Sequence, residues 1–187
     1  MSLTAGQASL RVHVWRKLRS LGSVYLQSSV CLLPDRPDTM RAVRRLLDRV
    51  HGDGGSGRLL RINLPDEDEA QDIREEFNSA RDGEYAEVLE RLPTLAQEIT
   101  MERGRGRATY AEVEESEADL ARFHTWLGKI ARRDYFAAPG GEAARAAVAA
   151  VGEQLAAFEE EALNAEAPPG RPLRAVPHQR TRRTADG

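Results

Sequence analysis

The spacing of apolar and polar residues predicts an N-terminal region of two helices and short strands. Apolar residues at helical spacing indicate a helix over residues 9–21. Two short apolar runs, 23–27 and 30–33, predict two strands or one bent strand with a bulge. A second amphipathic helix is expected over residues 37–50, with a proline at its start, and Arg-Leu-Leu-Arg-Ile-Asn-Leu at 58–64 predicts a further strand. The apolar face of the first helix consists of Leu10, Val14, Leu18 and Leu21.

The remainder of the chain has the pattern of acidic amphipathic helices with almost no strand signal. The first is expected over residues 66–92, and Pro93 should kink or break it because proline lacks the N–H that a helix interior uses. A further helical stretch leads to an Arg/Gly loop at 103–107. Thr109, with a glutamate three residues later, forms a capping-box pair that opens the next helix, and a last helix is expected over 143–163.

This order of elements predicts an α+β protein. A helix-strand-strand-helix-strand run is a ferredoxin-like unit whose first strand is missing or degenerate, since residues 1–8 are small and polar. We expect residues 1–8 to be disordered or tag-like and residues 9–65 to form the ferredoxin-like unit. The all-α region, 66–164, should pack on it, and the Arg/Pro-rich tail, 165–187, should be disordered.

The charge is distributed very unevenly, although the formal net charge of the 187 residues is only −3. Residues 1–61 hold eleven Lys/Arg against four Asp/Glu, so their net charge is +7. Residues 62–164 hold eleven against twenty-four, −13, and residues 165–187 hold five against two, +3. Such asymmetry indicates either a nucleic-acid surface or two regions that pack on each other.

Composition narrows the class of protein further. The chain lacks an apolar run of about 20 residues and the apolar centre of a signal peptide, so we expect a cytoplasmic protein that does not enter a membrane. A single cysteine, Cys31, excludes an intramolecular disulfide. In its apolar strand this thiol is expected to be a small buried hydrophobe rather than a redox sensor.

Particular residues resemble a known family. Residues 10–35, LRVHVWRKLRSLGSVYLQSSVCLLPD, are similar to the opening of the N-terminal domain of the chromate-resistance regulator ChrB. Residues 75–87, EEFNSARDGEYAE, and 131–136, ARRDYF, resemble the helical half of that domain. The resemblance covers residues 10–163 and implies a chromate-responsive, DNA-binding transcriptional regulator. A more distant likeness is to the ferredoxin-like middle domain of the phenylacetate repressor PaaX.

The two N-terminal helices carry the candidate nucleic-acid contacts. Arginines three and four residues apart share one face of a helix, so the second helix should expose several together. Three interpretations stay open: contact with DNA or RNA phosphates, pairing with the acidic helices, and plain solvated surface. The candidate residues are Arg11, Arg16, Lys17, Arg19, Arg41, Arg44, Arg45 and Arg49. Flexible arginines of the 103–107 loop and of the tail would add non-specific affinity.

A second group of polar residues is expected to form a network between two of the acidic helices. It consists of Arg81, Asp82, Glu84, Tyr85, Arg132, Arg133, Asp134 and Tyr135. A structural Arg–Asp lock and a family-specific functional site are both consistent with this composition. The four histidines lack metal-ligand spacing and no catalytic motif is found, so we predict no metal site, no cofactor and no catalytic residues.

These observations favour a non-enzymatic regulatory protein that binds DNA and is linked to transcriptional control of chromate resistance. One alternative is a protein-interaction module that does not bind DNA. An unpaired sheet edge would support this function, and we expect a homodimer through that edge. A metal-dependent nuclease or phosphodiesterase is the third class.

Overall fold

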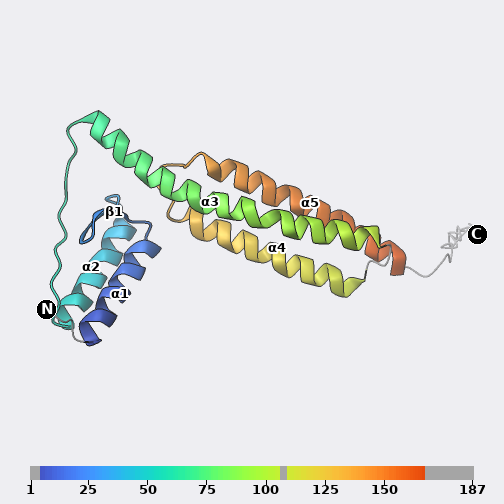
Figure 1. Ribbon diagram of the computed structural model, residues 1–187, viewed down its shortest axis with the longest axis horizontal. Coiled ribbons are helices and arrows are strands. Elements are labelled where there is room, and N and C mark those ends of the chain that lie inside the picture. The colour runs from blue at the N-terminus through green and yellow to red at the C-terminus, as the bar shows by residue number, and fades with distance from the viewer. Residues whose placement is uncertain (1–4, 106–108, 167–187) are drawn as a thin grey trace, which may run out of the picture.

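The computed structural model describes residues 5–105 and 109–166, and Figure 1 shows their arrangement. Two helices and a small hairpin form an N-terminal unit, and three long helices form a bundle. The predicted α+β class is therefore correct, with helix far exceeding strand. The elements are α1 (Ala5–Ser20), β1 (Val24–Gln27), β2 (Val30–Leu32), α2 (Pro37–Gly52), α3 (Glu67–Gly104), α4 (Tyr110–Ala131) and α5 (Gly140–Glu166).

The N-terminal unit consists of α1 and α2 lying side by side and the antiparallel hairpin β1–β2. The hairpin is irregular, because its register shifts between Tyr25 and Gln27. Both predicted strands and the predicted second helix are confirmed. The first helix starts at Ala5, within the segment that we expected to precede the fold.

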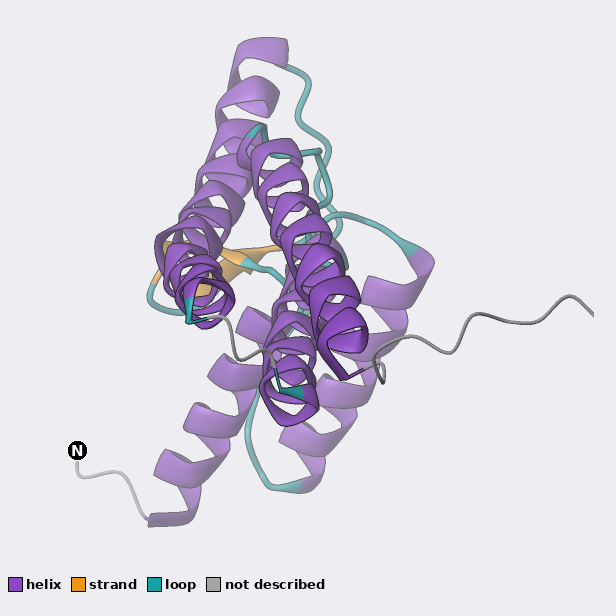
Figure 2. Ribbon diagram, turned by 90° about the vertical axis from the view of Figure 1, so that its right-hand side faces the viewer, coloured by secondary structure: helices purple, strands orange, loops and turns teal. Residues whose placement is uncertain are grey.

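The three-helix bundle contains the main hydrophobic core of the described chain. The helices α3, α4 and α5 run alongside one another in Figure 1, and Figure 2, with helices in purple and strands in orange, shows that the described chain is mostly helix. A side chain caps the N-terminus of α3 and that of α4. Asp66 accepts backbone hydrogen bonds at the start of α3, and Thr109 forms the predicted capping box with Glu112 at the start of α4. The fully buried core side chains include Val88, Ile99, Val113, Ile130, Val148 and Phe158.

Two sequence predictions were wrong. Residues 58–64 form no strand: within the described chain no strand neighbours them, and a ladder needs backbone partners on an adjacent segment. The sheet therefore has only two of the three strands expected of a ferredoxin-like unit. Pro93 was expected to kink or break the helix, and the break is absent, because α3 continues through it. Pro93 is exposed and lies between the buried Leu92 and Leu95, which keep the helix packed in the bundle on both sides of it.

Residues 53–66 connect the unit to the bundle as an extended segment, drawn at the left of Figure 1 beside α2. None of the described helices is both long and apolar enough to span a bilayer. Three segments lie outside the described residues: 1–4, 106–108 and 167–187. They include Arg107 of the predicted loop and the five arginines of the tail. The predictions of disorder at the two termini fall largely on them.

Candidate functional site

A partly buried ion cluster lies where the bundle meets the N-terminal unit. Arg81 on α3 is only 5% exposed and donates to Glu84 Oε1 at 2.9 Å. Arg133, just after α4, donates from Nε to the other oxygen of the same carboxylate at 3.0 Å. One carboxylate thus serves two guanidinium groups, and Arg81 Nε has no hydrogen-bond partner among the described residues. The cluster joins α3 to the end of α4 and carries an excess of positive charge.

A second set of hydrogen bonds fixes the turn between α4 and α5. Tyr85, fully buried, donates from its hydroxyl to Asp134 Oδ2 at 3.1 Å, while Asp134 Oδ1 accepts from the Ala138 N–H at 3.0 Å. Asp82 Oδ1 accepts from the Gly140 N–H at 2.7 Å, at the start of α5. Burial raises the pKa of the Tyr85 hydroxyl, and the nearby Asp134 carboxylate raises that pKa further.

A third set of contacts, which shares Arg81 with the ion cluster, holds the N-terminal unit against the bundle. The Tyr135 hydroxyl donates to the Leu21 carbonyl at 2.6 Å, and Arg81 NH1 lies 3.5 Å from the Gly22 carbonyl. Arg36, just before α2, donates to the Tyr135 carbonyl at 2.8 Å and places its guanidinium 5.0 Å from the centre of the Tyr135 ring. We call this set of contacts the junction. It connects the ends of α1 and α2 to the bundle.

Gly22 is required by the close approach at the junction. Its φ of +76° is in the left-handed region that favours glycine. An added Cβ would lie 2.7 Å from Arg133 Cβ and 2.7 Å from Arg81 NH1. The chain after α1 therefore passes directly over the two arginines.

Seven of the eight residues expected in the polar network take part in the ion cluster, the α4–α5 turn or the junction. Arg132 is the exception, because it is exposed and makes no side-chain hydrogen bond or ion pair within the described chain. Sequence reasoning did not find the partners in the N-terminal unit, namely Leu21, Gly22 and Arg36. Backbone carbonyls have no sequence signature, and a glycine after a helix indicates only a cap.

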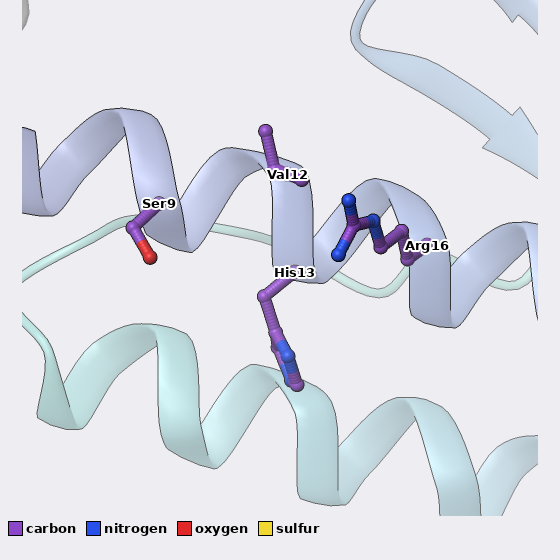
Figure 3. A pocket seen from close by; sticks show the side chains of 4 residues that line it. All are labelled: Ser9, Val12, His13 and Arg16. Carbon is purple, nitrogen blue, oxygen red and sulfur yellow. The ribbon is translucent and has the colours of Figure 1, made fainter.

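All eight predicted basic residues are exposed on α1 and α2, in different settings. Arg41, Arg44 and Arg45 share the solvent face of α2, opposite a buried face of Thr39, Ala42, Leu46 and Val50. On α1, Arg11 lines the groove described below, and the Arg19 guanidinium lies 5.2 Å from the Trp15 ring centre. Arg16 lines a shallow hollow with Ser9, Val12 and His13, where Figure 3 shows His13 pointing toward α2.

These basic side chains do not pair with the acidic helices. Of the eight, only Arg49 forms an ion pair within the described chain, with Asp53 one turn later at 3.7 Å. The ion pairs of the bundle are formed among its own residues, as in Arg74–Glu67 and Arg103–Glu161. The positive charge of the N-terminal unit therefore stays at its surface.

An open apolar groove of about 1800 Å³ lies in the N-terminal unit. It is lined by residues 25–33 of the hairpin and the chain after it, by residues 53–62, and by side chains of α1 and α2. Leu60 and Ile62, 75% and 60% exposed, are among the most exposed large apolar residues described. Both strands of the two-stranded sheet are edge strands, and both line this groove; the expected homodimer through a sheet edge stays a prediction.

Cys31 lies on β2 and lines the same groove, where it is half-buried. Burial raises the pKa of its thiol above the ordinary value, which disfavours the reactive thiolate. In the part of the chain that the structure describes, no three His, Cys, Asp or Glu side chains gather as a metal-binding group.

These features define a class: an α+β protein in which a small basic unit is joined through a partly buried ion cluster to an acidic three-helix bundle. A family model described as "Protein ChrB, N-terminal" matches residues 11–168. The chain belongs to this family. No curated protein and no solved structure matches the chain. The more distant likeness to PaaX stays a prediction.

Proposed function

We propose that the protein is a non-enzymatic, cytoplasmic regulator that binds DNA through α1 and α2 and controls transcription linked to chromate resistance. Membership of the ChrB N-terminal family supports the link to chromate resistance. The exposed basic helices support contact with the phosphate backbone.

The proposal rests on the solvent face of α2, which we call the basic face and whose three arginines have no ion-pair partner in the described chain. Within the described chain, Arg41, Arg44 and Arg45 form no ion pair, although the bundle has a large excess of carboxylates. Arginines left in solvent on one helix face can each release a counterion on binding a phosphate. Arginine also matches phosphate oxygens with two parallel donors.

The junction gives this surface a fixed position relative to the bundle. The chain leaves α1 through Leu21 and Gly22, both held by the bundle, and enters α2 after Arg36, which is held by Tyr135. The two DNA-binding helices are therefore anchored at one end each. A rearrangement of the bundle would move both helices together, which is one way in which a regulator can respond to a signal.

The proposal is tested by fluorescence anisotropy with a labelled 30-base-pair duplex of random sequence. Arg41→Gln/Arg44→Gln/Arg45→Gln should weaken binding by about tenfold or more at low salt, since three phosphate contacts are lost. The matched control, Arg91→Gln/Arg122→Gln/Lys129→Gln, removes three charges from exposed positions of the bundle. It should leave the affinity within about twofold of the unmodified protein.

Two results would contradict the proposal. One is absence of binding by the unmodified protein at low salt. The other is an equal loss of affinity in both triple variants, which would mean that net charge and not the α2 face determines binding. Circular dichroism at 222 nm confirms that both variants retain their helices.

A further inference from the structure

A shallow hollow on α1 gathers three polar side chains on one face of the helix. Ser9, His13 and Arg16 line it together with Val12, and its volume is about 450 Å³. Residues three, four and seven positions apart lie on the same side of a helix, which explains why these four meet. In Figure 3, His13 points toward α2, and the Arg16 guanidinium reaches back along α1 toward the turn that holds His13.

No acidic side chain lines this hollow. The whole of α1, residues 5–20, contains no Asp or Glu, although the chain has 30 of them, and the helix carries four basic residues. Within the described chain, neither His13 nor Arg16 forms an ion pair. The hollow therefore favours an anion.

The donors of the hollow suit a phosphate group. The Ser9 hydroxyl and a ring N–H of His13 can each donate one hydrogen bond, and the Arg16 guanidinium can donate two in parallel. Serine and arginine are common donors to the phosphate oxygens of DNA. A small molecule binds where a pocket encloses most of its surface, which this shallow hollow does not do. A phosphate that belongs to a duplex needs no such enclosure.

The hollow lies where a duplex on the basic face can reach it. It is on a different side of α1 from the groove, since only Val12 lines both. His13 points toward α2, whose solvent side is the basic face. Helices that pack side by side lie about 8–10 Å apart, and the grooves of B-DNA are about 6 and 12 Å wide. Two adjacent helices can thus contact phosphates on the two sides of one DNA groove.

We propose that Ser9, His13 and Arg16 together bind one phosphate of the DNA backbone, so that the DNA surface extends from α2 onto α1. This site rests on the proposed function and adds Ser9 and His13 to it, two residues that a count of basic side chains does not find. Because the three side chains act on the same phosphate, loss of one should weaken the contact that the others make.

A double-mutant cycle tests this arrangement, with DNA affinity measured by anisotropy on the labelled duplex at low salt. Arg16→Gln and His13→Ala should each weaken binding about threefold. The double variant should weaken it about fivefold or less, whereas independent losses would multiply to about ninefold. Arg16→Gln should also reduce the slope of log affinity against log salt by about 0.9.

The matched control cycle combines His13→Ala with Arg19→Gln. Arg19 is an exposed arginine of α1 that does not line the hollow, and its guanidinium lies over the Trp15 ring instead. In this cycle the two losses should multiply, because they affect different contacts. Circular dichroism at 222 nm confirms that the variants keep their helices. Ser9→Ala, at an exposed position, replaces His13→Ala in both cycles if His13→Ala loses helix.

The ring signal of His13 in a proton–nitrogen NMR spectrum gives a readout that does not depend on affinity. The chain has four histidines, and His13→Ala identifies the signal. Addition of the duplex should shift this signal, and the shift should be smaller in Arg16→Gln. Inorganic phosphate alone at about 1 mM should leave it in place, since a single phosphate lacks the contacts that the duplex makes with α2.

The outcomes separate this site from the proposed function. Multiplying losses in the His13 and Arg16 cycle, or a His13 signal that does not respond to DNA, would overturn the site. The proposed function would stand in that case if Arg41→Gln/Arg44→Gln/Arg45→Gln still weakens binding. A shift caused by inorganic phosphate alone would overturn the assignment to DNA and make the hollow a site for free phosphate. Absence of DNA binding by the unmodified protein would overturn the function and the site together.

Discussion

The Tyr135 hydroxyl donates a 2.6 Å hydrogen bond to the Leu21 carbonyl, and through it the bundle holds the last turn of α1. Tyr135→Phe removes this bond and should cost about 1 kcal/mol, since the carbonyl loses its donor. Amides at 20–32 should then exchange about fivefold faster, while the bundle core is unchanged. Tyr110→Phe, at an exposed position at the far end of α4, is the control. Unchanged exchange at 20–32 would show that the junction does not anchor α1.

Among the described residues, Glu84 is the one carboxylate that pairs with both Arg81 and Arg133. Glu84→Gln keeps the shape but leaves two guanidinium groups without their counter-charge, one of them almost fully buried. The free energy of unfolding should fall by about 3 kcal/mol, measured by urea denaturation. Glu87→Gln, exposed one turn further along α3, should change it by less than about 0.5 kcal/mol. Similar values for the two variants would refute the role of the ion cluster.

The buried Tyr85 hydroxyl gives the fold a dependence on alkaline pH. Its pKa in the folded protein lies above the ordinary value of about 10, because burial and the Asp134 carboxylate disfavour the phenolate. The stability from the neutral hydroxyl is therefore complete below about pH 10 and is lost as the pH rises further. Tyr85→Phe should flatten the decline of unfolding free energy above pH 10, whereas Tyr110→Phe should not. A decline of equal steepness in both variants would contradict this assignment.

Pro93 lies inside α3 on the exposed side of the helix. Pro93→Ala restores an N–H that the carbonyl of Leu89 can accept, so the bundle should become more stable by up to about 3 kcal/mol. Thermal unfolding followed at 222 nm measures the change. Thr94→Ala, at the next exposed position, should contribute less than about 1 kcal/mol. A loss of stability in Pro93→Ala would mean that the proline fits a bend that the bundle needs.

Much of the fold was predictable from local patterns, because helix periodicity and capping depend on residues close in sequence. The capping box of Thr109 and Glu112 and the two short strands were found in this way, whereas their pairing as a hairpin was not predicted. The strand at 58–64 was wrong because a strand depends on a neighbouring segment, which local alternation does not reveal. The break at Pro93 was wrong because the buried leucines on either side outweigh the local preference of proline.

The three candidate sites, namely the polar network, the basic helices and the groove, were predictable from the sequence to different degrees. Complementary charges at 81–84 and 133–134 identified the polar network, and the structure adds its contacts with backbone carbonyls of the N-terminal unit. Counting charges along the sequence identified the two basic helices. It did not decide whether their arginines form ion pairs with the acidic helices. Only the geometry of the ion pairs answers that question, because pairing depends on which surfaces meet. The groove had no sequence signal beyond the absence of a first strand.

The central claim is that the arginines of α2 contact DNA phosphates, and the salt dependence of DNA affinity tests it most directly. The slope of log affinity against log salt should be about 0.9 shallower for each phosphate contact removed. Arg41→Gln/Arg44→Gln/Arg45→Gln should therefore reduce the slope by up to about 2.7, and Arg91→Gln/Arg122→Gln/Lys129→Gln should leave it unchanged. Identical slopes for the unmodified protein and the α2 variant would contradict the account.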